Sequence, residues 1–310
     1  MERGMNKIVI VSQKTRLQEL KERFNTKEQA QFYVEHLGAD FGDYLDEDRT
    51  YTETLTRVRD IAAKYARISL IDKTFVFQYI FGRDDIVICV GRDGLVVNTM
   101  KYLENTNPVI GVNPDAGRWD GVVLPFTADT LEAILPHVIR GEASKRAITF
   151  AHAITQNGQE LYAANDLFIG PSSHISARYD ISYQGRTEAQ SSSGVIISTG
   201  LGQTGWFKSI IAQVKGSAEF LGMEEAGYTP LRWEDRALTF AVREPYPSVN
   251  SHAGIVMGRI SGTETLVLRS NMAEKGVIFS DGIENDYIDF NSGTEVTVSV
   301  AEKQGMLVTG

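Results

Sequence analysis

Long apolar runs, cysteines and an excess of basic residues are all missing from this sequence of 310 residues. No apolar run approaches membrane-spanning length, so we expect no contact with a membrane. The single cysteine, Cys89, excludes an intrachain disulfide and any metal site built from several cysteines. Because it stands within an apolar run, we expect a small buried hydrophobe rather than a nucleophile. The net charge of −9 disfavours a nonspecific nucleic-acid binder, whose footprint is basic.

Targeting signals and metal-ligand patterns are also missing. The opening residues, MERGMNKIVIVSQ, offer too short a lead-in for a transit peptide and too short an apolar run for a signal peptide. A cytoplasmic location is therefore the expectation. The histidines show no ligand spacing, so we expect no dedicated zinc site; they are His36, His137, His152, His174 and His252.

The stretch from Asp85 to Asn113 carries the clearest pattern in the chain. Ile86–Val90 is short and β-branched, which is typical of a strand buried on both faces. Apolar residues then recur at helical spacing as far as Leu103, and 109–112 reads as a second buried strand. Strands that alternate with helices predict a parallel sheet with helices on both faces.

The turn Gly91-Arg92-Asp93-Gly94 follows the first of these strands directly. Ligands of such sheets bind outside the carboxyl ends of the strands. Glycines let a ligand approach the backbone, and the N-terminus of the next helix favours an anion. A carboxylate there would repel a phosphate unless it held Mg²⁺ or accepted a proton. From the residues alone, Asp93 is either the chemical residue of a phosphoryl-transfer site or an ordinary turn residue.

Several ordered segments resemble those of the NAD kinase family. VGRDGLVVNTMKYL and PVIGVN are similar to its Gly-Gly-Asp-Gly-Thr segment and to the strand that follows. YAANDLFIG (162–170) resembles its Asn-Glu segment, and SSSGVIISTGLGQTGWFKS (191–209) resembles its Gly-rich nucleotide-binding segment. VREP and FSDG agree in order too. The resemblance runs from about Ile86 to the C-terminus, and its details look most like the mitochondrial-type branch.

The resemblance implies a fold of two parts. We expect an α/β N-terminal domain with a parallel sheet over residues 1–143, followed by a β-rich C-terminal domain over residues 144–310. The segment Gly141-Glu142-Ala143-Ser144 is the expected joint, and the expected site is the crevice between the domains. By resemblance alone we also expect a homodimer or larger homo-oligomer.

Local signals place further elements of the first domain. Thr15 and Thr26 fit helix N-caps. The apolar spacing predicts a helix over Tyr51–Ala66, whereas the acidic run Asp40–Asp48 reads as a solvated face. The aromatic-rich stretch Phe75–Ile80 reads as a short helix in the core.

The pattern changes to short strands after the joint. Asn157-Gly158 and Asp281-Gly282 predict hairpin turns, and one helix is expected over Trp206–Val214. The expected strands are Ala147–Ala153, Leu167–Gly170, Ser176–Tyr183, Gly194–Thr199, Leu238–Arg243, Ile255–Ile260, Thr265–Leu268, Val277–Ser280 and Val296–Val300.

NAD kinases move the γ-phosphoryl group of ATP to the adenosine-ribose 2′-hydroxyl of NAD. The resemblance assigns Asp93 the role of the base that takes the hydroxyl proton, a step typically worth ~10²–10⁴-fold. Gly91 and Gly94 would shape the approach of the phosphates, and Mg²⁺ would neutralise their charge. The resemblance therefore implies ATP and Mg²⁺ as cofactors and NAD as the substrate.

The sequence departs from the family in this turn. Arg92 replaces the second glycine, and Leu95 replaces the threonine. If that glycine needs a positive φ, a non-glycine residue costs roughly 1–2 kcal/mol. The guanidinium could clamp a phosphate bidentately, or it could fill the space where the phosphates of ATP lie.

The later segments supply the expected nucleotide contacts. The resemblance implies hydrogen bonds from Asn165 and Asp166 to the ribose and adenine portions, although Asp166 is one methylene shorter than the family's Glu. Asn-Asp also favours a plain turn between strands, and Trp206 also fits the core of the domain. The residues that match the lining of the NAD site are Thr204, Gly205, Trp206 and Ser209.

Three hypotheses follow. The first is an NAD kinase that uses ATP and Mg²⁺ and gives NADP. The second is an NAD(P)-binding protein of the same fold that has lost catalysis, a hypothesis motivated by Arg92 and Leu95. The third is a kinase of the wider superfamily that acts on a lipid or sugar hydroxyl, against which the matches in 162–170 and 191–209 argue.

Overall fold

The structure, a computed structural model, describes residues 7–223 and 227–310 and divides into two compact units. The first six residues, on which the targeting prediction partly rests, lie outside the described residues. Unit 1 ends at Arg146 and also contains Gly305–Gly310, whereas unit 2 is Ala147–Gln304. The change of unit thus falls just after the predicted joint, and the last residues of the chain belong with the first unit. Among the described residues, no helix has both the length and the apolar character of a membrane span.

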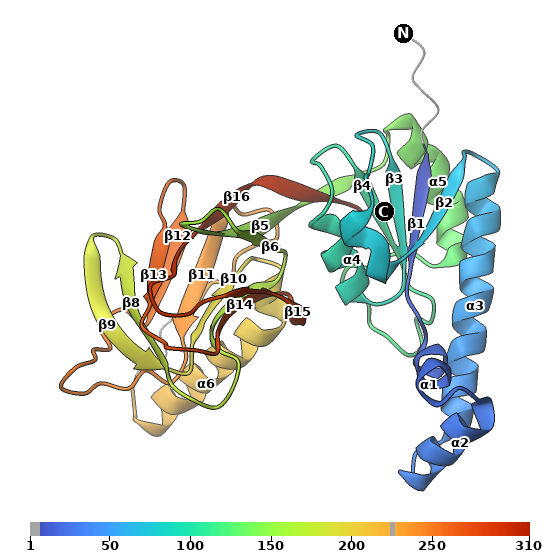
Figure 1. Ribbon diagram of the computed structural model, residues 1–310. Helices are drawn as coiled ribbons and strands as arrows, with labels where there is room; N and C mark the ends of the chain where they lie inside the picture. Colours follow the sequence, from blue (N-terminus) through green and yellow to red (C-terminus); the bar gives the residue numbers. More distant parts are fainter. Residues whose placement is uncertain (1–6, 224–226) are drawn as a thin grey trace. The chain divides into compact units, whose positions relative to one another are not determined.

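A parallel sheet forms the centre of unit 1 (Figure 1). The strand order is β2-β1-β3-β4, and the last residues of β16 pair with β4 in the same direction. The strands β3 and β4 are buried along their whole length, as their continuous apolar sequences predict. The bounds are Ile8–Ser12 for β1, Ile68–Asp72 for β2, Ile86–Val90 for β3, Pro108–Val112 for β4 and Glu295–Val308 for β16.

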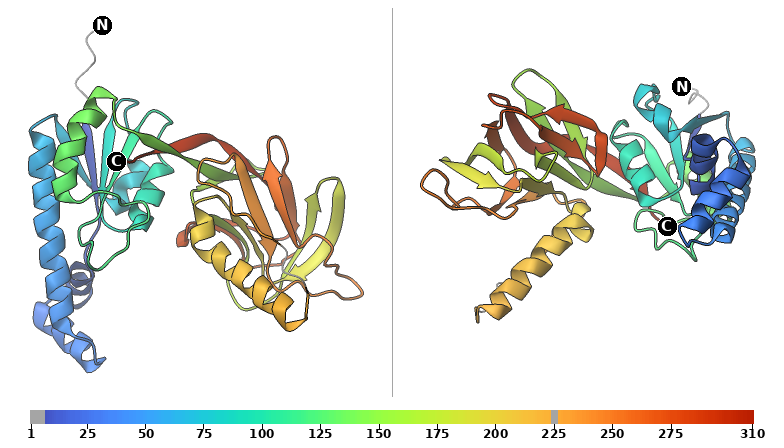
Figure 2. Two further views of the ribbon diagram at one scale, coloured as in Figure 1. Left: turned by 180° about the vertical axis from the view of Figure 1, so that it is seen from behind. Right: turned by 60° about the horizontal axis from the view of Figure 1, so that its bottom comes forward.

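Helices cover both faces of this sheet. Helices α3 (Phe41–Ala63) and α5 (Ala128–Arg140) pack side by side on one face, as Figure 2 shows from behind. Helix α4 (Asp93–Met100) covers the other face. There the pKa of Cys89 is raised to about 12 by burial, as expected of a structural cysteine.

Local capping signals correctly predict two helix starts. Thr15 closes a capping box with Gln18 at the start of α1 (Arg16–Phe24), and Thr26 accepts a hydrogen bond from the Gln29 amide at the start of α2 (Lys27–His36). The side chains of these caps satisfy amide groups that the first helical turn leaves without partners.

Two expectations for unit 1 are wrong. Helix α3 begins ten residues before the predicted start at Tyr51, because Asp40 caps it and the acidic run forms its first turns. Several of those acids pair with arginines rather than facing solvent alone. The aromatics Phe75 and Phe77, expected in the core, are 60% and 61% exposed, and only Val76 of that 3₁₀ turn is buried.

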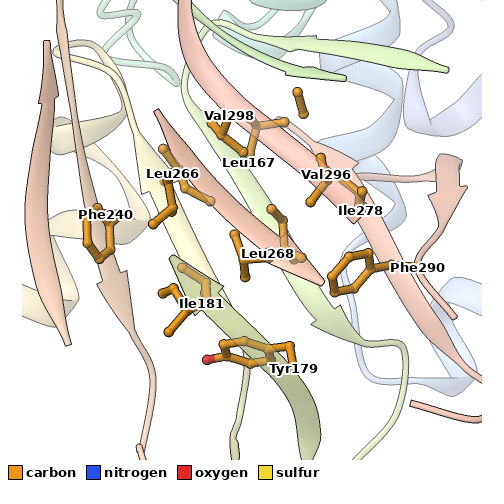
Figure 3. Close-up of a cluster of buried hydrophobic side chains, with 14 of the residues drawn as sticks. Leu167, Tyr179, Ile181, Phe240, Leu266, Leu268, Ile278, Phe290, Val296 and Val298 are labelled. Carbon is orange, nitrogen blue, oxygen red and sulfur yellow. The ribbon is translucent and has the colours of Figure 1, made fainter. Parts of the chain in front are cut away.

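Unit 2 is a sandwich of β-sheets. One sheet has the order β12-β11-β10-β7-β14-β15, and the facing strands include β9, β8, β13 and β16. Side chains from both layers interdigitate in the core, where Leu167 and Ile278 meet Leu266 and Val298 (Figure 3). The bounds are Asp166–Pro171 for β7, Ala177–Tyr183 for β8, Arg186–Ser192 for β9, Val195–Ser198 for β10, Ala237–Val242 for β11, Met257–Ser261 for β12, Leu266–Ser270 for β13, Gly276–Ser280 for β14 and Ile283–Asp289 for β15.

The outer face of the six-stranded sheet carries helix α6 (Trp206–Phe220). Phe207 is its buried anchor and packs with Phe168 and Ile196 of the sheet. The strands β5 (Lys145–Thr155) and β6 (Glu160–Ala163) form the hairpin predicted at Asn157-Gly158. Asp281 and Gly282 both have positive φ between β14 and β15, so the second predicted turn is confirmed as well.

Candidate functional site

The turn that follows β3 belongs entirely to unit 1. Arg92 is the N-cap residue of α4, and Asp93 is its first helical residue, directly beyond the carboxyl end of the strand. This is the edge of a parallel sheet at which ligands bind. The structure therefore places the predicted base at a position suited to a site.

The carboxylate of Asp93 is held by the loop that follows β4. Its Oδ1 accepts a hydrogen bond of 2.8 Å from the backbone N–H of Val123. Asp93 is half-buried, and among the described residues only the Oδ1 atom of its carboxylate has a hydrogen-bond partner. Asp93 is thus an oriented acceptor rather than a freely rotating turn residue.

Arg92 adopts an ordinary backbone conformation, with φ −97° and ψ 166°. The strain that a positive φ would impose does not arise, so the replacement of glycine has no backbone cost at this position. The guanidinium lies over the ring of Trp119, with Cζ 3.9 Å from the ring centroid, and its Nη2 is 3.4 Å from Glu47 Oε1.

Gly91 and Gly94 differ in what their lack of a side chain permits. A Cβ on Gly91 would lie 2.9 Å from Leu95 Cδ2 and 3.0 Å from the amide carbon of Gln13, whereas a Cβ on Gly94 would meet nothing within 4 Å. Leu95 is buried and packs into the space beside Gly91. The packing of Leu95 and Gln13 therefore favours glycine at the first position of the turn, whereas the last position has open space among the described residues.

A second cluster of predicted residues lies in unit 2. Asn165 and Asp166 stand where the chain enters β7, and Asp281 faces them from the turn after β14. The carboxylate of Asp281 accepts hydrogen bonds from three successive backbone N–H groups, those of Ala164 at 3.1 Å, Asn165 at 2.7 Å and Asp166 at 3.2 Å. Asp281 thus fixes the backbone from which the Asn-Asp pair projects.

Asp166 is buried without a full set of partners. Asp166 is only 9% exposed, and its Oδ1 atom has no hydrogen-bond partner among the described residues. Burial raises the pKa of this carboxyl to about 7, a hydrogen bond with Ser198 opposes the shift, and the nearby Asp281 charge adds to it. A buried acceptor of this kind is expected to be a functional group.

The Gly-rich segment packs directly behind this pair. The Thr199 hydroxyl donates to the carbonyl of Ala164, and the Thr199 N–H donates to the carbonyl of Asn165 at 2.9 Å. Gly202 lies against the same Asn165 carbonyl. The segments 162–170 and 191–209, which are separated along the chain, therefore meet in one cluster of unit 2.

The residues at the start of α6 are at the surface. The Thr204 hydroxyl donates to Leu201 O at 2.9 Å, and the Ser209 hydroxyl donates to Trp206 O at 2.6 Å, so both hydroxyls satisfy local carbonyls. Gly205 is exposed beside them. Trp206 is 39% exposed and stacks on Phe168 with ring centroids 5.7 Å apart. It is therefore a partly exposed aromatic surface rather than a core residue.

The sequence does not predict the positioning roles of two residues. Asp281 belongs to the FSDG segment and to a predicted hairpin turn, but neither feature predicts its contact with the backbone of Asn165. No motif in the sequence marks Trp119, the residue under Arg92. The register of β14 against β7 brings Asp281 to the Asn-Asp pair, since Ser280 pairs with Leu167. The signal in the sequence is the FSDG match, which marks the segment of Asp281 without showing what its carboxylate contacts.

We expect Gly202→Ala to destabilise unit 2. A Cβ at this position would lie 2.2 Å from Asn165 O and 2.6 Å from Ser198 Oγ, and the first of these is a backbone atom that cannot turn away. Overpacking of this kind costs roughly 1–3 kcal/mol. Thermal unfolding of the purified variant measures the loss. Gly205→Ala is the matched control, because its nearest contact would be at 3.5 Å. Equal melting temperatures for the two variants would contradict the prediction.

Comparisons with known proteins bear on what this arrangement does. No protein-family model matches the chain. A curated relative, the probable NADH kinase of Oryza sativa subsp. japonica, is 25% identical over 223 residues, which make up 64% of this chain and 63% of the relative. The chain thus matches less than two thirds of the length of that relative.

Two solved structures share the fold. The NAD kinase from Archaeoglobus fulgidus in complex with ATP has a TM-score of 0.57 and 14% identity, covering 98% of this chain and 93% of that one. Yeast NADH kinase complexed with NADH has a TM-score of 0.61 and 15% identity, and the match covers 99% of this chain and 84% of the yeast chain. The chain has the fold of these dinucleotide kinases, an α/β unit with a parallel sheet followed by a β-rich unit, as predicted. The resemblance to the NAD kinase family is likewise confirmed, while the mitochondrial-type branch stays a prediction.

Proposed function

We propose that this protein is a kinase of NAD or NADH that transfers the γ-phosphoryl group of ATP to the 2′-hydroxyl of the adenosine ribose and so forms NADP or NADPH. The observation that supports it best is the cluster in unit 2, where the Asn-Asp pair and the Gly-rich segment pack against each other and Asp166 keeps a buried acceptor without a partner. The sequence match to a probable NADH kinase supports the same reaction class.

In this proposal Asp93 of unit 1 is the general base. A ribose hydroxyl is a weak nucleophile until its proton is taken, and a carboxylate fixed in orientation can take it as the oxygen attacks the phosphorus. The bond between Asp93 Oδ1 and the Val123 N–H leaves Oδ2 to face the hydroxyl. ATP enters as its Mg²⁺ complex, which neutralises charge on the transferred group.

The residues of unit 2 bind the acceptor in this proposal. Asn165 and Asp166 offer hydrogen bonds to hydroxyl and amine groups of the adenosine portion, and Asp281 holds their backbone in place. Gly205 and the exposed ring of Trp206 offer a flat contact surface, with Thr204 and Ser209 beside it. We also propose that the protein acts as a homo-oligomer.

Formation of NADP by the purified full chain tests this function. The protein is incubated with ATP and Mg²⁺ and with NAD or NADH in parallel, and the product is measured with an NADP- or NADPH-specific enzyme. We expect product from at least one acceptor. If neither acceptor reacts while calorimetry still detects NAD or NADH binding, the protein is the binding protein of the second hypothesis, which the buried Leu95 and the placement of Arg92 would then explain.

A further inference from the structure

Six charged side chains of unit 1 form an alternating series that ends at Arg92. Glu47 pairs with both Arg92 and Arg16, and Arg16 pairs in turn with Asp43 at 2.8 Å. Asp43 also pairs with Arg118 at 2.6 Å, and the guanidinium of Arg118 reaches Asp115 at 3.3 Å. The series joins α1, α3, the turn before α4 and the loop after β4.

Arg92 differs from the two other arginines of this series. Among the described residues, Arg16 and Arg118 each have two carboxylate partners, whereas Arg92 has one, at 3.4 Å, the longest distance in the series. That partner, Glu47, is already paired with Arg16. The positive charge of Arg92 is therefore the least compensated of the three.

The close contact with Trp119 restricts the directions in which the N–H groups of Arg92 can point. A guanidinium that lies with its face on an aromatic ring points its N–H groups outward in its own plane, the direction from which a phosphate binds two of them. Only Nη2 donates to a partner among the described residues. The side chain is 45% exposed, and the cavity that it lines together with Glu47 and Trp119 is about 20 Å³, room for one water molecule but not for a phosphate. A phosphate would thus meet Arg92 from the solvent side.

We propose that Arg92 is a residue that binds the phosphates of the phosphoryl donor and so determines donor affinity. The inference rests on the proposed function, since it places the guanidinium one residue before the proposed base. Of the two alternatives that the sequence leaves open at this position, the proposal takes the phosphate clamp. The side chain is held by Glu47 and Trp119, and among the described residues it makes no ion pair with Asp93.

Binding of MgATP to Arg92 variants tests the proposal independently of turnover. We expect Arg92→Gln to raise the dissociation constant and the KM for MgATP by about 10- to 100-fold, the usual effect of losing a charge-assisted bidentate contact. Arg92→Lys keeps the charge but loses the planar fork, so its effect should be smaller. The KM for NAD should stay within about twofold. The melting temperature should be nearly unchanged, because the pair is long, its guanidinium is 45% exposed, and Glu47 keeps its partner Arg16.

Arg49→Gln is the matched control. Arg49 also lies in unit 1, pairs with one carboxylate, Asp46, and is well exposed, so its loss changes the net charge equally without touching the turn. Its affinity for MgATP should equal that of the wild type. An Arg92→Gln variant with unchanged MgATP affinity and a lowered melting temperature would make Arg92 a structural latch. An Arg92→Gly variant that binds MgATP more tightly would make it a block to the donor.

These outcomes remain distinct from failure of the proposed function. If the wild type binds MgATP and yields neither NADP nor NADPH, the kinase proposal fails, and the affinity comparison still decides the role of Arg92. If the wild type does not bind MgATP, the inference about Arg92 is overturned.

Discussion

An Asp93→Asn variant is expected to lose about 10²- to 10⁴-fold in kcat for NADP formation, the usual contribution of a positioned general base. The amide that replaces the carboxylate still offers an oxygen to the N–H of Val123, so the turn and the start of α4 should keep their geometry. What disappears is the basic oxygen that takes the proton of the ribose hydroxyl. The KM for NAD should change little, because Asn165 and Asp166, the proposed acceptor contacts, belong to unit 2.

Steady-state kinetics with NAD as the varied substrate separate these effects. Asp120→Asn is a suitable control, since Asp120 is an exposed carboxylate of the same loop that holds Asp93. It should retain the wild-type rate. A kcat for Asp93→Asn within about threefold of the wild type would rule out the base role, because general-base removal costs at least ~10²-fold.

The centre of unit 1 is predictable because it depends on local patterns. Strand β3 matches its predicted bounds, Ile86–Val90, since five consecutive β-branched or small apolar residues between polar turns allow little else. The N-caps Thr15 and Thr26 are predictable for the same reason, because each hydroxyl contacts a backbone N–H only three residues further along the chain. The predicted base follows from this framework and from a resemblance in sequence.

The contacts that orient the site are not local, and for that reason the sequence does not reveal them. Asp281 reaches the backbone of Asn165 across more than 110 residues, through the register of two strands. The acids at the start of α3 resemble a solvated run until Arg16 and Arg118 are placed beside them. Polarity in sequence shows that a side chain needs a partner, whereas only the fold shows which one.

Strand β16 shows the same limit in a different form. The sequence predicts a strand over Val296–Val300, but the strand continues to Val308 through a polar stretch that includes Glu302 and Lys303. Apolar residues resume at Met306 and Leu307, which pair with β4. The last residues belong to the first unit because Met306 and Leu307 extend its parallel sheet. The hydrophobic alternation along one strand does not show which sheet the strand joins.

Replacing Asp166 with Asn should change how stability depends on pH. The pKa of this buried carboxyl is raised to about 7 in the folded protein, against 3.8 for the ordinary group. The folded state therefore binds the proton more tightly than the unfolded state between these two values. By linkage, the contribution of Asp166 to the free energy of unfolding falls as the pH rises from about 4 to about 7. Above about pH 7 this contribution stays constant at its lowest value.

The size of the effect follows from the shift. A shift of about three pKa units corresponds to about 4 kcal/mol at 1.36 kcal/mol per unit, an upper value for the penalty of burying the charge. Asp166→Asn carries no charge at any pH, so it should match the wild type near pH 4 and be more stable by about 2–4 kcal/mol at pH 8. Urea unfolding at a series of pH values measures this difference.

Asp289→Asn, a change at an exposed carboxylate of β15, is the control and should follow the wild-type curve. Parallel pH profiles for Asp166→Asn and the wild type would contradict the prediction.

The same titration links stability to the proposed function, because a protonated carboxyl donates one hydrogen bond whereas a carboxylate only accepts. If Asp166 meets a hydroxyl or amine of NAD as an acceptor, the ligand should favour the charged form and lower the pKa of Asp166. NAD should then stabilise the wild type more at pH 8 than at pH 5, and Asp166→Asn should show equal stabilisation at both.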